Sequence, residues 1–96
     1  MQFLVLSRRR TDVFPLEDWT PELIEAEGQR VRQLYIAGII RTIWRRKDMP
    51  GAVIVMEAAS EEEAREAVAS LPLAKRDMLE VVAFTQLEPY PGFAPR

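Results

Sequence analysis

The sequence predicts an α+β fold of one domain. Segments with the apolar spacing of strands alternate along the chain with two segments that have helical spacing. The chain has 96 residues, which leaves room for one domain; we place it at residues 1–87, followed by a proline-rich C-terminal tail at residues 88–96. Because 48% of the residues are hydrophobic and 29% are charged, the composition is that of a globular protein.

The first half of the chain is predicted to contain a strand, a loop and a long helix. Residues 2–7 (QFLVLS) form the strand, and residues 11–19, with mixed polar residues and a proline, form the loop. Residues 20–22 (Thr-Pro-Glu) start a helix, since they supply a hydroxyl cap, a proline at the first helical position and an acid in the first turn. We expect this helix to reach Ala37 and to end at Gly38.

The second half contributes three strands and a second helix. Residues 39–46 and 52–57 are predicted strands joined by an Asp-Met-Pro-Gly turn. Residues 60–63 (Ser-Glu-Glu-Glu) form a capping box that opens a helix ending near Ser70. Residues 79–87 supply the fourth strand.

The resulting order, β-α-β-β-α-β, is the ferredoxin-like arrangement, with both helices on one face of a four-stranded antiparallel sheet. A sheet with one wet face alternates apolar and polar residues, whereas these strands are apolar on both faces. A second copy is the simplest cover for the other face. We therefore predict a homodimer packed sheet to sheet, a dimeric α+β barrel, with room for a higher oligomer. The two alternating sets are Phe3 and Val5 against Leu4 and Leu6, then Ala52, Ile54 and Met56 against Val53 and Val55, and last Val81 and Ala83 against Val82 and Phe84.

The amino-acid composition excludes several kinds of catalytic and binding site. The chain has no cysteine and no histidine, which excludes disulfide scaffolds, zinc fingers, thiol nucleophiles and Ser-His-Asp triads. The acids at residues 61–66 suit the start of a helix, so we expect no metal site. The glycines form no phosphate-binding pattern, and we expect no cofactor. A net charge of −2 with only short basic clusters, at residues 8–10 and 45–47, argues against nucleic-acid binding. We expect no membrane segment and a cytoplasmic location.

Glu27 is the candidate acid or base. It lies within the apolar stripe of the first helix, three residues after Ile24 and four before Val31. A carboxylate that faces a core must be paired, protonated or functional, and burial raises its pKa toward the range of a general acid or base. The alternative is a structural ion pair with an inward arginine such as Arg41.

Arg41 and Arg45 share a face of the predicted second strand, where an arginine can bind a substrate carboxylate through two hydrogen bonds. The alternative is that both keep an edge strand soluble. Trp44, on the opposite face, and Tyr35, in the helical stripe, are candidates for substrate binding, with core or interface packing as the alternative.

The tail from Glu88 onward is rich in proline and carries Tyr90 and Phe93. Proline favours extended backbone, so the tail could cross onto a neighbouring subunit or cap a pocket, with the two aromatic residues as anchors. The alternative is a frayed terminus.

Three segments of the chain resemble the muconolactone delta-isomerase family: Glu27 with the helix that follows, residues 34–45 (LYIAGIIRTIWR), and residues 60–73 (SEEEAREAVASLPL). The resemblance implies a ferredoxin-like fold, pairing through the sheets, ring-shaped assembly and a role in the breakdown of aromatic compounds. It also implies the family reaction, in which a small unsaturated lactone bearing a carboxylate loses a proton at C4 and regains one at C2. Glu27 would carry the proton, and Arg41 or Arg45 would hold the carboxylate.

This chain departs from typical isomerases of the family at Leu4 and Leu6, where the family has polar or basic residues, and at residues 50–54 (PGAVI). The departures predict a more apolar ligand. Two other functions stay open. A non-catalytic dimeric ligand-binding or oligomerisation module predicts Glu27 paired with arginine and no cavity, and a cofactor-free oxygenase predicts a larger apolar cavity beside Trp44 or Tyr35.

Overall fold

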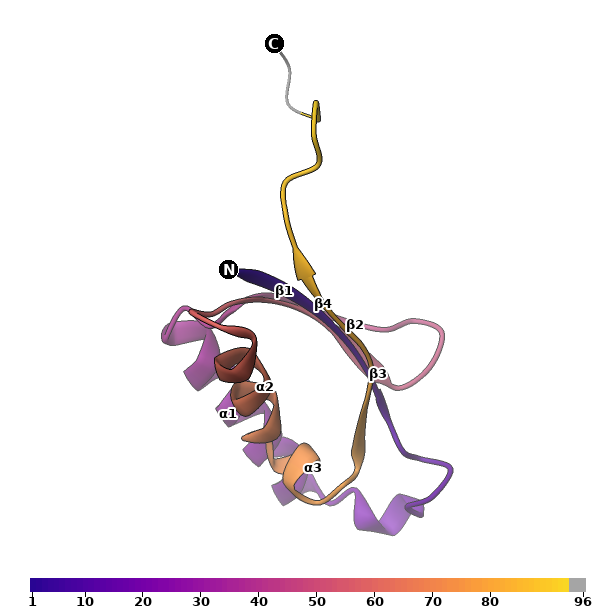
Figure 1. The fold of residues 1–96 in the computed structure, drawn as a ribbon. Helices are drawn as coiled ribbons and strands as arrows, with labels where there is room; N and C mark the ends of the chain where they lie inside the picture. The colour runs from indigo at the N-terminus through magenta and orange to yellow at the C-terminus, as the bar shows by residue number, and fades with distance from the viewer. Residues whose placement is uncertain (94–96) are drawn as a thin grey trace.

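The computed structural model describes residues 1–93 and has the predicted α+β fold (Figure 1). Two short helices add to the predicted elements, a 3-10 helix in the first loop and a four-residue helix after the second predicted helix. The elements in chain order are β1 (Gln2–Arg9), the 3-10 helix η1 (Leu16–Asp18), α1 (Pro21–Ile36), β2 (Ile40–Arg45), β3 (Gly51–Glu57), α2 (Glu61–Ala69), α3 (Pro72–Lys75) and β4 (Leu79–Leu87).

The four strands form one antiparallel sheet in the order β2-β3-β1-β4, which is the ferredoxin-like order. The strand β1 lies in the centre, paired with β3 on one side and β4 on the other. Figure 1 shows α1, α2 and α3 on the same side of the sheet. The predicted layering is therefore confirmed.

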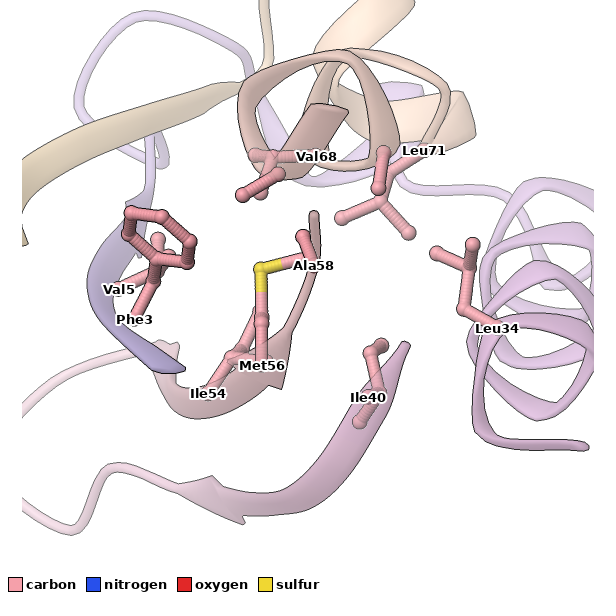
Figure 2. Packing of buried hydrophobic residues seen from close by; sticks show 11 residues of the cluster. Phe3, Val5, Leu34, Ile40, Ile54, Met56, Ala58, Val68 and Leu71 are labelled. Carbon is pink, nitrogen blue, oxygen red and sulfur yellow. The ribbon is translucent and has the colours of Figure 1, made fainter. Parts of the chain in front are cut away.

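The core lies between the sheet and the helices. Phe3 and Val5 of β1 and Met56 of β3 are buried and point toward the helices, where Leu34 of α1 and Leu71 meet them (Figure 2). Each such side chain contributes about 1.5–3 kcal/mol when fully buried. This layer fixes the distance between α1 and the sheet.

Both long helices begin at the predicted caps. The Thr20 hydroxyl accepts the Leu23 N–H at 3.2 Å, and the Ser60 hydroxyl accepts the Glu63 N–H at 3.1 Å. Gly38 ends α1 with a φ of 80°, a backbone conformation that glycine adopts without strain.

A bulge in β2 was not predicted. Ile40 pairs with Met56 and Thr42 with Val55, so Arg41 has no partner in β3. As a result Ile40 and Ile43 both face the helices, although simple alternation places them on opposite faces. The alternation that put Arg41 beside Arg45 does not hold across the bulge.

The face of the sheet away from the helices carries apolar side chains that no element covers among residues 1–93. Leu4, Leu6, Val53 and Val55 are partly exposed on this face, and the Trp44 side chain, in register with Val53, is 67% exposed. The predicted dimer would cover this face.

The tail extends away from the sheet beyond β4 (Figure 1). Tyr90 and Phe93 are exposed, so within residues 88–93 the tail caps no pocket of its own chain. Contact with a neighbouring subunit stays a prediction, and residues 94–96 lie outside the described residues. In the described part of the chain, every helix is too short or too polar to cross a membrane.

Gly51 allows a close approach of β3 to β1, and its replacement is expected to destabilise the fold. A Cβ at Gly51 would collide with the Ser7 carbonyl oxygen and lie 2.9 Å from the Arg8 Cα. We expect Gly51→Ala to lower the free energy of unfolding by at least about 2 kcal/mol, because backbone atoms must move.

Gly28 is the matched control. It lies inside α1, where an added Cβ meets only an Arg32 guanidinium nitrogen at 3.4 Å, so Gly28→Ala should raise the free energy of unfolding by about 0.5–1 kcal/mol. Urea denaturation of both variants measures the difference. A Gly51→Ala variant as stable as the wild type would contradict the close approach.

Candidate functional site

Glu27 is buried as predicted, with its residue surface only 8% exposed. It lies on the face of α1 that packs toward the sheet. Among the described residues Glu27 forms no ion pair, and Arg41 is exposed on β2. The alternative of a structural pair between Glu27 and Arg41 is therefore wrong.

A backbone group of α3 holds the Glu27 carboxylate instead. Oε1 of Glu27 accepts a hydrogen bond from the Leu73 N–H at 3.0 Å. Leu73 lies in the first turn of α3, directly after Pro72, so this N–H has no partner within the helix. The Leu-Pro-Leu sequence after α2 thus has a defined role, since it turns a free N–H toward the carboxylate.

The second carboxylate oxygen, Oε2, is available for chemistry. It has no hydrogen-bond partner among the described residues. No side-chain oxygen or nitrogen in that part of the chain is both sealed from solvent and without a partner, so Oε2 is not fully buried. One oxygen fixes the carboxylate and the other is free to accept a proton.

Glu27 lies at the wall of a cavity of about 250 Å³ between α1 and the sheet. Most of the lining side chains are apolar, and the polar ones come from Glu27, Ser7 and Arg9. Among the described residues that line it, Glu27 and Arg9 are the only charged ones. The remaining lining residues are Ile24, Gly28, Val31, Ile43, Gly51, Ala52, Ile54, Leu71 and Leu79.

Burial raises the pKa of Glu27 above its ordinary value of 4.5. Two weaker effects oppose it, the hydrogen bond from the Leu73 N–H and the positive charge of Arg9, both of which favour the ionised form. The net direction is upward, which moves the carboxyl group toward the pKa range of a general acid or base.

A wider cleft of about 1010 Å³ adjoins the cavity. Both are lined by Arg9, Ile24 and Gly51, so the two hollows lie side by side, and we call the wider cleft the entrance. The cleft is also lined by Arg45, Arg46 and Lys47, with Asp48 as its only acid among the described residues. Arg46 pairs with Asp48 at 2.7 Å. The remaining basic side chains make the entrance attractive to an anion.

The other predicted substrate-binding residues lie elsewhere. Arg45 lines the entrance, whereas Arg41, Tyr35 and Trp44 line neither the cavity nor the cleft. Tyr35 is 62% exposed on α1, so its predicted place in the buried stripe is wrong. Leu4 and Leu6, where the chain departs from typical isomerases, face away from the cavity and do not make its lining more apolar. Residues 50–54 are the second such departure, and from them Ala52 and Ile54 contribute apolar lining.

Arg9 and Ser7 were not predicted as site residues. The strand was predicted to end at Ser7, but β1 continues to Arg9. In a strand, alternate residues share a face, so Ser7 and Arg9 follow Phe3 and Val5 on the face toward the helices. If the predicted strand had been extended by two residues, its alternation would have placed Arg9 on the face toward the helix stripe that contains Glu27.

The fold and the cavity define a class of protein: a small ferredoxin-like α+β domain with a buried, unpaired carboxylate between helix and sheet, beside an entrance rich in basic residues. The residues described contain no cluster of three or more side chains suited to hold a metal ion. The chain belongs to the muconolactone delta-isomerase family, whose family model matches residues 1–92.

Two solved structures have a similar fold. A crystal structure of muconolactone isomerase is similar with a TM-score of 0.79 and 21% identity, covering 100% of this chain and 97% of the other. A 5-chloro-2-hydroxyhydroquinone dehydrochlorinase from Burkholderia phenoliruptrix AC1100, in complex with 2,5-dihydroxybenzoquinone, has a TM-score of 0.60 and 21% identity, covering 92% and 94%. At this identity both support the fold alone. Among curated proteins the chain has no significant match.

Because the pKa of Glu27 is raised, ionisation of this group at high pH should lower the free energy of unfolding. Glu27→Gln should remove this effect. Because the folded-state pKa lies above the unfolded value, the wild type is penalised least below pH 4.5 and loses stability as pH rises through the folded pKa. Each pKa unit of difference corresponds to about 1.4 kcal/mol. The glutamine carbonyl can still accept the Leu73 N–H.

We therefore expect the Gln variant to be equally or more stable than the wild type at pH 8, with the difference shrinking toward pH 4. Urea denaturation across this pH range measures it. Glu25→Gln, at an exposed position of the same helix, is the control and should show no such trend. The compared quantity is the stability of the Gln variant minus that of the wild type. If this difference is smaller at pH 8 than at pH 4, the direction of the pKa shift is contradicted.

Proposed function

We propose that this chain is an isomerase that moves a double bond within a small unsaturated lactone bearing a carboxylate. The observation that carries the proposal is the Glu27 carboxylate, buried at the wall of a cavity with one oxygen anchored and the other free. The cavity of about 250 Å³ is smaller than the roughly 300–1,000 Å³ typical for drug-sized ligands, which favours a small ring.

Glu27 would act first as base and then as acid. Its free oxygen takes the proton from C4, the electrons of that C–H bond form the new C3–C4 double bond, and the former C2–C3 double bond shifts into a dienolate. The same carboxyl group then returns the proton to C2, so no atom is gained or lost. Burial supports this role because the group exchanges a proton near neutral pH most easily when its pKa is raised.

The entrance would attract the negatively charged substrate. Arg45, predicted from the sequence to bind the carboxylate, lines this entrance together with Lys47. In the described part of the chain, neither of them forms an ion pair that would cancel its charge. Such charges act over several ångströms and raise the local concentration of an anion.

The geometry favours isomerisation over the two other functions considered. A non-catalytic module predicted Glu27 paired with arginine and no cavity, yet the carboxylate is unpaired beside a cavity. An oxygenase predicted a larger apolar cavity beside Trp44 or Tyr35, and neither residue lines the Glu27 cavity.

Glu27→Gln is expected to lower kcat for lactone isomerisation by roughly 10²–10⁴-fold, the usual contribution of a positioned acid or base. The variant keeps the shape and the Leu73 hydrogen bond, so KM should change little. The loss of the lactone absorbance in steady-state assays measures both constants. Glu25→Gln is the control and should retain wild-type rates; equal, appreciable rates for Glu27→Gln would remove Glu27 from the mechanism.

We also propose that the chain forms a homodimer through the open face of the sheet. Support comes from the exposed Trp44 and the partly exposed Leu4, Leu6, Val53 and Val55, which continue across β1, β2 and β3. Monomeric proteins seldom leave such a contiguous apolar surface in water.

Sedimentation equilibrium tests the dimer. The wild type should have twice the 11.0 kDa mass of the chain, or a higher even multiple. Leu6→Glu should give the monomer mass, because the carboxylate would be buried without a partner in the interface. Leu16→Glu, on η1 away from the sheet, is the control. A wild-type monomer would contradict the proposal.

A further inference from the structure

We propose that Arg9 binds the carboxylate of the substrate inside the Glu27 cavity and thereby orients the reacting ring toward Glu27. This inference deepens the proposed function and rests on it. Arg9 was not among the arginines that the sequence suggested for this role. It is a positioning residue for the reaction and a determinant of specificity for acids over esters.

Arg9 lies where the entrance cleft and the Glu27 cavity adjoin. Arg9 lines both the entrance cleft and the Glu27 cavity, and it is the only cation that lines the cavity among the described residues. Arg45 lines only the entrance. A ligand whose ring lies beside Glu27 in this cavity is therefore in the same hollow as the Arg9 side chain.

The three consecutive arginines at residues 8–10 differ in their ion pairs. Arg8 pairs with Asp12 at 3.0 Å and with Glu80 at 3.1 Å, and Arg10 pairs with Asp77 at 2.6 Å. Arg9, between them, forms no ion pair with any described residue. Its neighbours are already paired with carboxylates, whereas its own guanidinium is free for a ligand.

Arg9 is also held in place. Its backbone N–H donates to the Pro50 carbonyl oxygen at 2.9 Å, and its guanidinium lies 5.9 Å from the centre of the Trp19 ring. The Trp19 indole N–H donates in turn to the Phe14 carbonyl oxygen at 3.1 Å, which fixes the ring. The loop between β1 and α1 therefore holds the arginine before any ligand arrives, which lowers the cost of binding.

Arg9 and Glu27 lie close enough to interact but not as an ion pair. The charge of Arg9 favours the ionised form of Glu27, yet no nitrogen–oxygen contact within 4.0 Å joins them. A guanidinium matches a carboxylate through two parallel hydrogen bonds. The apolar wall, which includes Val31, Ile43 and Leu71, would then contact the ring. The cavity thus fits a small apolar ring with one carboxylate arm.

The test measures binding of furan-2-acetate, a five-membered oxygen ring with a carboxylate arm, and of its methyl ester by isothermal titration calorimetry. The full chain is used as wild type, Arg9→Met, Arg9→Lys and Arg45→Met. We expect Arg9→Met to weaken binding of the acid roughly 10- to 100-fold, the worth of a charged hydrogen-bond pair, and to leave ester binding within twofold. Arg76→Met, at an exposed position after α3, is the control and should bind both as the wild type does.

Arg9→Lys keeps the charge but loses the paired hydrogen bonds, so we expect an intermediate loss of at least threefold for the acid; this variant also covers the case in which Arg9→Met does not fold. Wild-type affinity for the acid in either folded Arg9 variant would overturn the proposal. So would a loss of acid binding in Arg45→Met larger than that in Arg9→Met, or a wild type that binds acid and ester equally.

Binding needs no turnover, so the two proposals fail separately. If the wild type does not isomerise the lactone but still prefers the acid in an Arg9-dependent way, the proposed reaction is wrong and the role of Arg9 as a carboxylate site stands. If the wild type isomerises the lactone, Arg9→Met should raise KM at least tenfold with a smaller change in kcat. An unchanged KM would contradict the role of Arg9 alone.

Discussion

The hydrogen bond from the Leu73 N–H to Glu27 is the interaction on which the rest of the site depends. A carboxylate is costly to bury, and here one backbone donor compensates for part of that cost. The donor exists because Pro72 starts a short helix directly after α2, and the acceptor exists because α1 turns Glu27 toward the sheet. Together they hold one carboxylate oxygen and leave the other free at the cavity wall.

The basic side chains near the cavity are arranged so that they can attract and bind an anionic substrate. The chain carries a net charge of −2, yet the entrance to the cavity is basic. Arg8 and Arg10 are used in ion pairs at the surface, and Arg9 alone reaches the cavity. The buried base is the group that takes the proton when the enolate forms, and the neighbouring cation is placed to bind the carboxylate of the substrate and so to orient the ring.

Much of the fold could be predicted from local signals. The caps at Thr20 and Ser60 and the stop at Gly38 are set by neighbouring residues, and the buried position of Glu27 follows from helical spacing. The bulge at Arg41, the short helix α3 and the reach of β1 to Arg9 could not be predicted, because they depend on pairing between distant strands and on a hydrogen bond across 46 positions of the chain. Arg9 was missed for that reason: its role arises only where β1 and α1 meet.

The central claim is that Glu27 is a poised acid or base in a cavity and not half of a structural ion pair. The most direct measurement is a carbon-13 NMR titration of the Glu27 carboxyl group in the wild-type protein without ligand, with Glu27→Gln used to assign the signal. The account predicts a midpoint clearly above the ordinary value of 4.5, because burial outweighs the Leu73 hydrogen bond and the charge of Arg9. A midpoint at or below 4.5 would show a carboxylate stabilised in its charged form, and it would contradict the account.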